Sequence, residues 1–167
     1  KAGEDNPRYS LNKLAMTAKI TAYDIGFYTG RDAGSGYSLG ELDGTYGSML
    51  RLAPQAINVS LFRPYLWEVR NPLMLLSALE SFLLCGLSIY IILKRNMGLF
   101  RAINNPNVLF AFIFSIAFAF PVGVSTLNFG TLVRYKIPLL PFFLVVLILI
   151  LNHSKSDRKL SELDSTE

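Results

Sequence analysis

The chain has 167 residues, a length that ordinarily forms one soluble domain with its own core. The composition excludes such a domain, because 51% of the residues are hydrophobic and only 17% are charged, against about 25% in an average globular protein. Twelve Phe, eight Tyr and one Trp also exclude a disordered chain. The net charge is +4, but the basic residues gather at the ends of apolar runs, so we expect no nucleic-acid partner.

Two amphipathic stretches and a glycine-rich loop make up the first part of the chain. Residues 10–23 and 48–63 carry apolar side chains at helical spacing, and Pro54 suits the first turn of a new helix. Seven of the twelve glycines lie between Gly26 and Gly47, a density that indicates a loop. A G-x-G-x-x-x-G run in this loop is one residue off the dinucleotide-binding pattern and follows no clear strand, so we expect no cofactor.

Neither the acidic residues nor the cysteine of the chain predicts a metal site. Four acidic residues lie in or near the loop: Asp24, Asp32, Glu41 and Asp43. Their spacing does not match a calcium-binding loop, and we expect them to be solvated, with an outer-loop acid or base beside Arg134 as the alternative. The single cysteine, Cys85, lies in an apolar run and has no second cysteine with which to form a disulfide or a metal site.

Three apolar runs follow, and each is a candidate membrane span. Residues 72–93 would form a helix about 33 Å long, enough to cross a hydrocarbon core of about 30 Å. The aromatic and charged residues just before this run, 62–68, are typical of a membrane–water interface. Residues 108–124 carry no charge, and Pro121 with Gly123 marks the expected exit of this span.

The third apolar run, residues 137–151, would be only about 22 Å long, so we expect its helix to begin near Thr131. The fold class that we predict is therefore an all-α integral membrane protein with about three transmembrane helices. These helices occupy residues 71–151, after an amphipathic and loop-rich segment at 1–70 and before a polar, frayed tail at 152–167.

The basic residues predict the orientation of the chain in the membrane. They cluster in the loop between the first two spans and in the tail 152–167, which the positive-inside rule places in the cytoplasm. Residues 1–70 and the loop 125–136 then share the outer face. Because the chain opens with no signal peptide, we expect it to be the C-terminal part of a longer polytopic protein, with proteolytic maturation as the alternative.

The residues that best suit a ligand lie at the mouth of the third span. Arg134 can grip a phosphate with two hydrogen bonds, Lys136 adds a point charge, and Tyr135 lies between them. We expect these three residues to contact a lipid-linked phosphate, and the alternative is that they only anchor the span among lipid headgroups. Pro138 and Pro141 remove backbone donors, so the chain there is expected to be unwound or to line a cavity.

Glu80 is the one acidic residue within a predicted span. An ionised carboxylate at mid-membrane costs at least about 2.5 kcal/mol and is rarely tolerated against lipid. One possibility is that Glu80 is part of a buried polar network or a proton path. The other is that its carboxyl is protonated, or paired within a larger helix bundle. In both cases we expect further transmembrane helices, from this or another chain, beside the first span.

Two motifs resemble those of known membrane proteins. The run Arg134-Tyr135-x-x-Pro138-x-x-Pro141-Phe142 resembles a pattern of bacterial polytopic proteins of envelope polysaccharide assembly. These include the GT-C-type integral-membrane glycosyltransferases, which take sugars from polyprenyl-phosphate carriers on the outer face. The stretch Phe62-Arg63-Pro64-Tyr65-x-Trp67-Glu68 resembles one that precedes a similar span in multi-span proteins of Bacteroidetes-like bacteria.

The resemblance covers about residues 50–145 and implies a protein of the bacterial inner membrane. Only Arg134 carries over, as a contact to the carrier phosphate. In the glycosyltransferases the catalytic acidic residue usually lies in an early outer loop that this chain does not match, so no catalytic residue is assigned. The resemblance implies an envelope-glycan enzyme or part of one, and the alternative is a non-catalytic, membrane-anchored subunit of a larger complex. A transporter fragment is a third hypothesis, which rests on Glu80 and the interrupted helix start.

Overall fold

A computed structural model describes residues 13–25, 27, 36–94 and 104–164, with side chains described as far as residue 152. Within these residues the chain is helical, and the only strand-like pairing is an isolated antiparallel bridge between Gly36 and Asn128. The elements, in chain order, are α1 (Leu14–Ile25), α3 (Tyr46–Arg51), α4 (Ala53–Phe62), the short 3-10 helix η4 (Leu66–Glu68), α5 (Pro72–Lys94), α7 (Pro106–Ser125), α8 (Phe129–Tyr135) and α9 (Leu139–Asp164).

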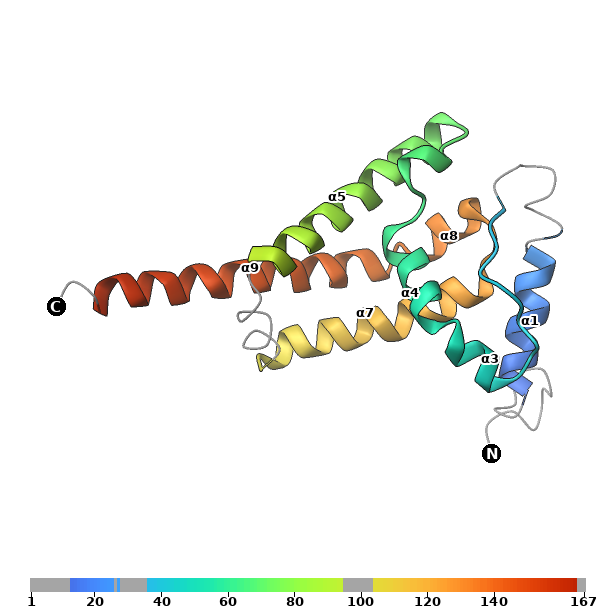
Figure 1. Ribbon diagram of the computed structural model, residues 1–167, viewed down its shortest axis with the longest axis horizontal. Helices are drawn as coiled ribbons and strands as arrows, with labels where there is room; N and C mark the ends of the chain where they lie inside the picture. The colour runs from blue at the N-terminus through green and yellow to red at the C-terminus, as the bar shows by residue number, and fades with distance from the viewer. Residues whose placement is uncertain (1–12, 26, 28–35, 95–103, 165–167) are drawn as a thin grey trace.

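The predicted all-α membrane architecture is confirmed. The helices α5, with 23 residues, and α7, with 20, are both long and apolar enough to cross a membrane. A third span is formed when α8 and the following helix, up to Asn152, are taken together. Figure 1 shows α7 and α9 side by side, with α5 crossing α9 obliquely and the shorter helices gathered at the end of the bundle where α5 begins.

The third span is broken where the prolines predicted an interruption. A turn at residues 136–138 separates α8 from α9, and the two helices are bent by 64°. Pro138 has no N–H to continue the helical ladder, which accounts for the break. The helix before it begins at Phe129, two residues earlier than expected, because the Asn128 side chain caps it by accepting from the Gly130 N–H at 2.7 Å.

One helix end agrees with the sequence-based expectation and another differs from it. The helix α7 runs through Pro121 and Gly123 and ends at Ser125, one residue beyond the expected end of the span at Val124. The backbone of α9 stays helical to Asp164, so the segment that we expected to be a frayed tail continues the last span as a helix.

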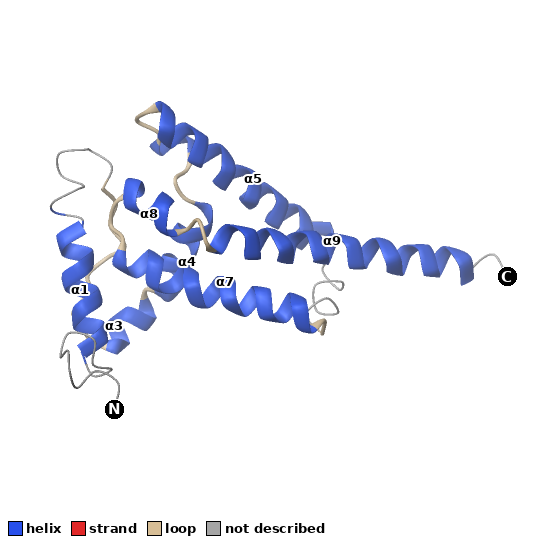
Figure 2. Ribbon diagram, turned by 180° about the vertical axis from the view of Figure 1, so that it is seen from behind, coloured by secondary structure: helices blue, strands red, loops and turns tan. Residues whose placement is uncertain are grey.

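The front helices pack on the bundle rather than standing apart from it. α4 makes its most extensive contact with α7, and α1 also packs on that helix. Pro54 lies in the first turn of α4, as predicted, and the polar side chains of Arg51, Gln55 and Asn58 are exposed. From the opposite face of α4, the buried Ser60 hydroxyl donates to the Ala119 carbonyl of α7 at 2.7 Å. Figure 2 shows α1, α3 and α4 at the same end of α7.

The same end of the bundle brings together two segments that the orientation argument predicted to share one face. The Tyr37 N–H donates to the Leu127 carbonyl at 3.0 Å, and the Tyr37 hydroxyl donates to the Thr126 carbonyl. For the described part of the front segment, its predicted position beside the loop 125–136 is therefore confirmed. The start of α5 also lies at this end, whereas the start of α7 lies at the other (Figure 1).

Candidate functional site

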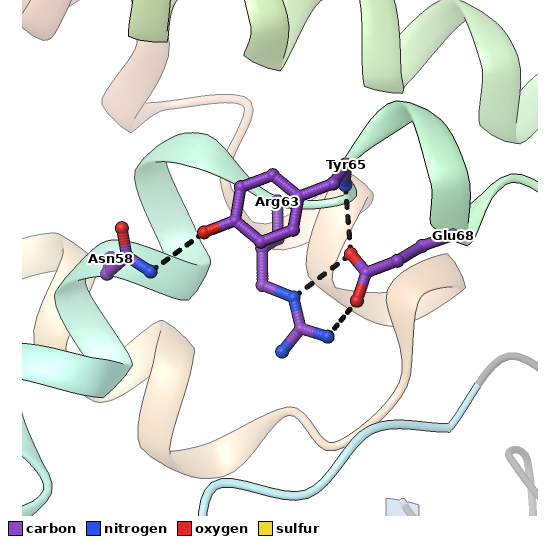
Figure 3. Close-up of polar contacts among 4 residues, drawn as sticks. All are labelled: Asn58, Arg63, Tyr65 and Glu68. Carbon is purple, nitrogen blue, oxygen red and sulfur yellow. Dashed lines mark hydrogen bonds and ion pairs between the residues drawn. The ribbon is translucent and has the colours of Figure 1, made fainter.

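An ion pair fixes the chain between α4 and α5. Arg63 caps the C-terminus of α4 and is joined to Pro64 by a cis peptide bond. The carboxylate of Glu68, in η4, accepts from Arg63 Nε at 3.0 Å and also from the second guanidinium nitrogen, Nη2. The same carboxylate accepts from the Tyr65 N–H at 2.9 Å (Figure 3). The paired side chains are thus held in one geometry by three hydrogen bonds.

Three aromatic rings surround the Arg63 guanidinium. Its central carbon lies 5.0 Å from the Phe129 ring centroid, 5.1 Å from that of Tyr37 and 5.7 Å from that of Tyr65. These rings come from α8, from the front segment and from the turn before η4. Cation–π attraction therefore adds to the ion pair and joins three parts of the chain around one cation. We call Tyr37, Arg63, Tyr65, Glu68 and Phe129 the Arg63 cluster.

Burial and pairing shift the pKa of two groups in this cluster. Burial raises the pKa of the Glu68 carboxyl, but hydrogen bonds from Arg63 and the Tyr65 N–H, with the Arg63 charge, outweigh it, so the net pKa is lower than usual. Burial raises the pKa of the Tyr37 hydroxyl to about 12, although the Thr126 hydrogen bond and the Arg63 charge act in the opposite direction. At neutral pH the cluster therefore holds an ionised Arg–Glu pair and a neutral tyrosine.

A pocket of about 270 Å³ lies between the start of α5 and α8, and we call it the Arg134 pocket. Its lining residues are Asn71, Leu73, Met74, Ser77, Phe129, Gly130, Val133 and Arg134. The Arg134 side chain is exposed, and Asn71 caps the α5 helix by accepting from the Met74 N–H at 2.7 Å. Most of the wall is apolar, and the guanidinium supplies its one formal charge.

A second pocket of about 270 Å³ shares Phe129 with the first, and we call it the Trp67 pocket. It is lined by Gly36, Tyr37, Ser38, Arg63, Trp67, Glu68, Arg70 and Phe129. Unlike the first pocket, it is lined mainly by polar and charged groups. Trp67 is 81% exposed, and its ring stacks on that of Tyr65 at 4.8 Å between centroids.

The structure separates the three residues that were expected to act together on a phosphate. Arg134 and Tyr135 are exposed at the end of α8, but the Lys136 side chain is fully buried. The Lys136 ammonium donates to Ser81 Oγ at 2.7 Å and to the Arg63 carbonyl at 3.3 Å. Of the three, only Arg134 lines the Arg134 pocket.

Glu80 lies on the outward side of α5, where its side chain is exposed. Its carboxyl lies near the buried Lys136 ammonium. Leu76 and Leu83, one helical turn before and after it, are 71% and 69% exposed. This face of α5 is therefore apolar apart from one carboxyl.

None of the described acidic residues of the glycine-rich loop or α1 lines the Arg134 pocket. Glu41 and Asp43 line a wide pocket of about 510 Å³ together with Arg51 and Gln55, and Asp24 is exposed on α1. Asp32 lies outside the described residues. Among the side chains that the structure describes, no three His, Cys, Asp or Glu residues group closely enough to hold a metal ion.

Sequence reasoning treated residues 62–68 as an interfacial stretch and did not foresee the ion pair. The available signal was a basic and an acidic residue, Arg63 and Glu68, on either side of a proline. The fold and the two pockets together define an α-helical membrane protein with ligand-sized hollows at one end of its bundle. Comparison of the chain with protein-family models, with curated proteins and with solved structures found no match.

Proposed function

We propose that this chain is the C-terminal, membrane-embedded part of a bacterial inner-membrane protein of envelope polysaccharide or glycolipid assembly. It binds a polyprenyl-phosphate-linked sugar at the Arg134 pocket, from the outer face. The observation that carries the proposal is the composition of that pocket, which has an apolar wall and one accessible guanidinium. A polyprenyl phosphate consists of the two matching parts, an apolar chain and an anionic group.

The surroundings of Arg134 favour a phosphate ligand. Its guanidinium is exposed and can form two parallel hydrogen bonds to phosphate oxygens. The N-terminus of α5 lies in the same wall, and its helix dipole adds a partial positive charge. Leu73, Met74 and Val133 supply the apolar surface for the first isoprene units of the carrier. Lys136 takes no part, because its ammonium is bonded inside the bundle.

A binding assay with the full chain in lipid nanodiscs tests this proposal. Arg134→Gln is expected to weaken binding of a radiolabelled polyprenyl phosphate by about 10- to 100-fold, the equivalent of a charge-assisted hydrogen bond of roughly 1.5–3 kcal/mol. Arg51→Gln, which removes an exposed arginine from α3, is the matched control and should leave affinity unchanged. Equal affinities for the wild type and Arg134→Gln would overturn the proposal.

A non-catalytic subunit is the second candidate function, and Glu80 favours it. An exposed carboxyl on an apolar helix face is unfavourable against lipid, and a neighbouring transmembrane helix would cover it. The same binding assay distinguishes the two candidate functions. A subunit without a carrier site retains no phosphate-dependent binding, so polyprenyl phosphate and polyprenyl alcohol would bind alike.

A further inference from the structure

We infer that the Trp67 pocket receives the sugar of the lipid-linked substrate. The inference rests on the proposed function, because it assumes that the carrier phosphate lies at Arg134. It assigns the second pocket a ligand class, a small carbohydrate head group, and divides the substrate between two adjoining sites.

The two pockets adjoin each other. Phe129 lines both of them, and the consecutive residues Arg70 and Asn71 line one each. In the inferred arrangement, a molecule whose phosphate binds Arg134 extends past Phe129 towards Trp67. The change from an apolar to a polar lining between the two pockets matches the order of groups in a polyprenyl-phosphate sugar.

The side chains of the Trp67 pocket suit a sugar. The Arg63 guanidinium is already engaged by Glu68 through two nitrogens, so it is not free to grip a phosphate. The remaining donors and acceptors of this neutral pair, together with the exposed Arg70, can bond to hydroxyl groups. Trp67 supplies a largely exposed aromatic ring for the apolar face of a sugar ring.

The geometry of the pocket is fixed before a ligand arrives. Stacking on Tyr65, with 23° between the ring planes, orients Trp67. The Tyr65 hydroxyl in turn accepts from Asn58 Nδ2 at 3.1 Å (Figure 3). A volume of about 270 Å³ is small among ligand pockets, which favours a single sugar ring over a long glycan. Preorganised groups of this kind lower the entropy cost of binding.

The single tryptophan of the sequence provides a direct reporter, because Trp67 is the only source of tryptophan emission. The full chain in nanodiscs is titrated with polyprenyl phosphate, and separately with the same carrier bearing one hexose or one N-acetylhexosamine. At least one glycosylated carrier should change the Trp67 emission, whereas the bare carrier should bind with a much smaller change. Equal emission changes for bare and glycosylated carriers would overturn the inference.

Variants separate the sugar site from the phosphate site. Radiolabelled ligands should show that Trp67→Ala and Arg70→Gln each weaken the glycosylated carrier about tenfold, roughly 1.4 kcal/mol, while the bare carrier binds as before. Arg134→Gln should weaken both ligands, and Arg51→Gln neither. If Trp67→Ala and Arg70→Gln have no effect while Arg134→Gln does, the sugar site is wrong and the proposed function stands. If Arg134→Gln has no effect on either ligand, the proposed function is wrong.

Discussion

Lys136 shows how a residue that looks like a ligand-binding cation can be part of the core. Its ammonium and the Ser81 hydroxyl both donate to the Arg63 carbonyl, at 3.3 and 3.1 Å, and the ammonium also donates to Ser81. These hydrogen bonds hold the turn between α8 and α9 against α5 and against the end of α4. A buried ammonium needs such partners, because an unsatisfied one would be costly inside the bundle.

Ser81→Ala is therefore expected to destabilise the protein. The substitution removes the closer partner of a fully buried ammonium, and the free energy of unfolding should fall by about 1–3 kcal/mol. Ser88→Ala on the same helix is the matched control. The Ser88 hydroxyl only bonds back to the Leu84 carbonyl one turn earlier, so its loss should cost well under 1 kcal/mol.

Reversible unfolding in mixed micelles measures both variants against the wild type. Equal effects of the two substitutions would show that Ser81 acts as an ordinary helix serine and that Lys136 does not depend on it.

At the level of single residues, the sequence predicts what a side chain can bond to better than it predicts where that side chain lies in the fold. The ability of an arginine such as Arg134 to bond to a phosphate, and the cost of placing a carboxyl such as that of Glu80 against lipid, follow from residue type and from the neighbouring apolar runs. The inward position of Lys136 could not be predicted, because it depends on Ser81 and Arg63, residues 55 and 73 positions away in the chain. No local sequence pattern indicates a contact between residues so far apart in the chain.

Among the helices, the crossing of α4 and α7 depends on a residue without a side chain. A Cβ atom added at Gly123 of α7 would lie 2.1 Å from the Ala56 carbonyl oxygen of α4. Ala56 itself is fully buried. The two backbones can approach this closely only because both residues are small, as is typical of helix packing in membranes.

Gly123→Ala is accordingly expected to push α4 away from α7. The added methyl group overlaps backbone atoms, which cannot rotate aside, and the free energy of unfolding should fall by about 1–3 kcal/mol or more. Gly86→Ala on α5 is the control, because nothing lies within 4 Å of an added Cβ there.

Thermal unfolding in detergent measures the two alanine variants side by side. We expect Gly86→Ala to unfold at or above the wild-type temperature, since alanine favours a helix. A Gly123→Ala protein as stable as Gly86→Ala would contradict the close crossing.

The sequence predicts the elements of the bundle more accurately than their packing. Apolar run length located α5 and α7 within one or two residues, and the prolines predicted the break before α9. The amphipathic pattern also gave the exposed face of α4. The helix that packs on α4 could not be predicted from periodicity. An apolar face indicates that a helix is buried on that side, but not against which other helix.

For the molecule as a whole, the arrangement places all candidate sites at one end of the bundle. Both pockets and the Arg63 cluster lie beside the start of α5 and the end of α7. The opposite end carries the C-terminal end of α5, with Lys94 in its last turn. The orientation predicted from the sequence, with the basic loop in the cytoplasm, would make the proposed ligand site face outwards.

Cysteine labelling tests this orientation. In a Cys85→Ser background, Asp43→Cys is expected to react with a membrane-impermeant maleimide in intact spheroplasts, because Asp43 is exposed at the ligand-site end. Asn104→Cys, just before α7, should react only after the membrane is permeabilised. The reverse pattern would place the ligand site in the cytoplasm, and reaction of both in intact cells would contradict the membrane crossing of α5.

The hydrogen bond from Ser60 to Ala119 also has a consequence for biosynthesis. These partners are 59 residues apart, so at about 5–20 residues per second the ribosome adds α7 some 3–12 s after α4 has emerged. During this interval α7 is not yet there to cover the small-residue face of α4. The earlier-made α4 can therefore dock only after α7 has been inserted. A delay in that insertion prolongs the period in which a protease can cleave the nascent protein.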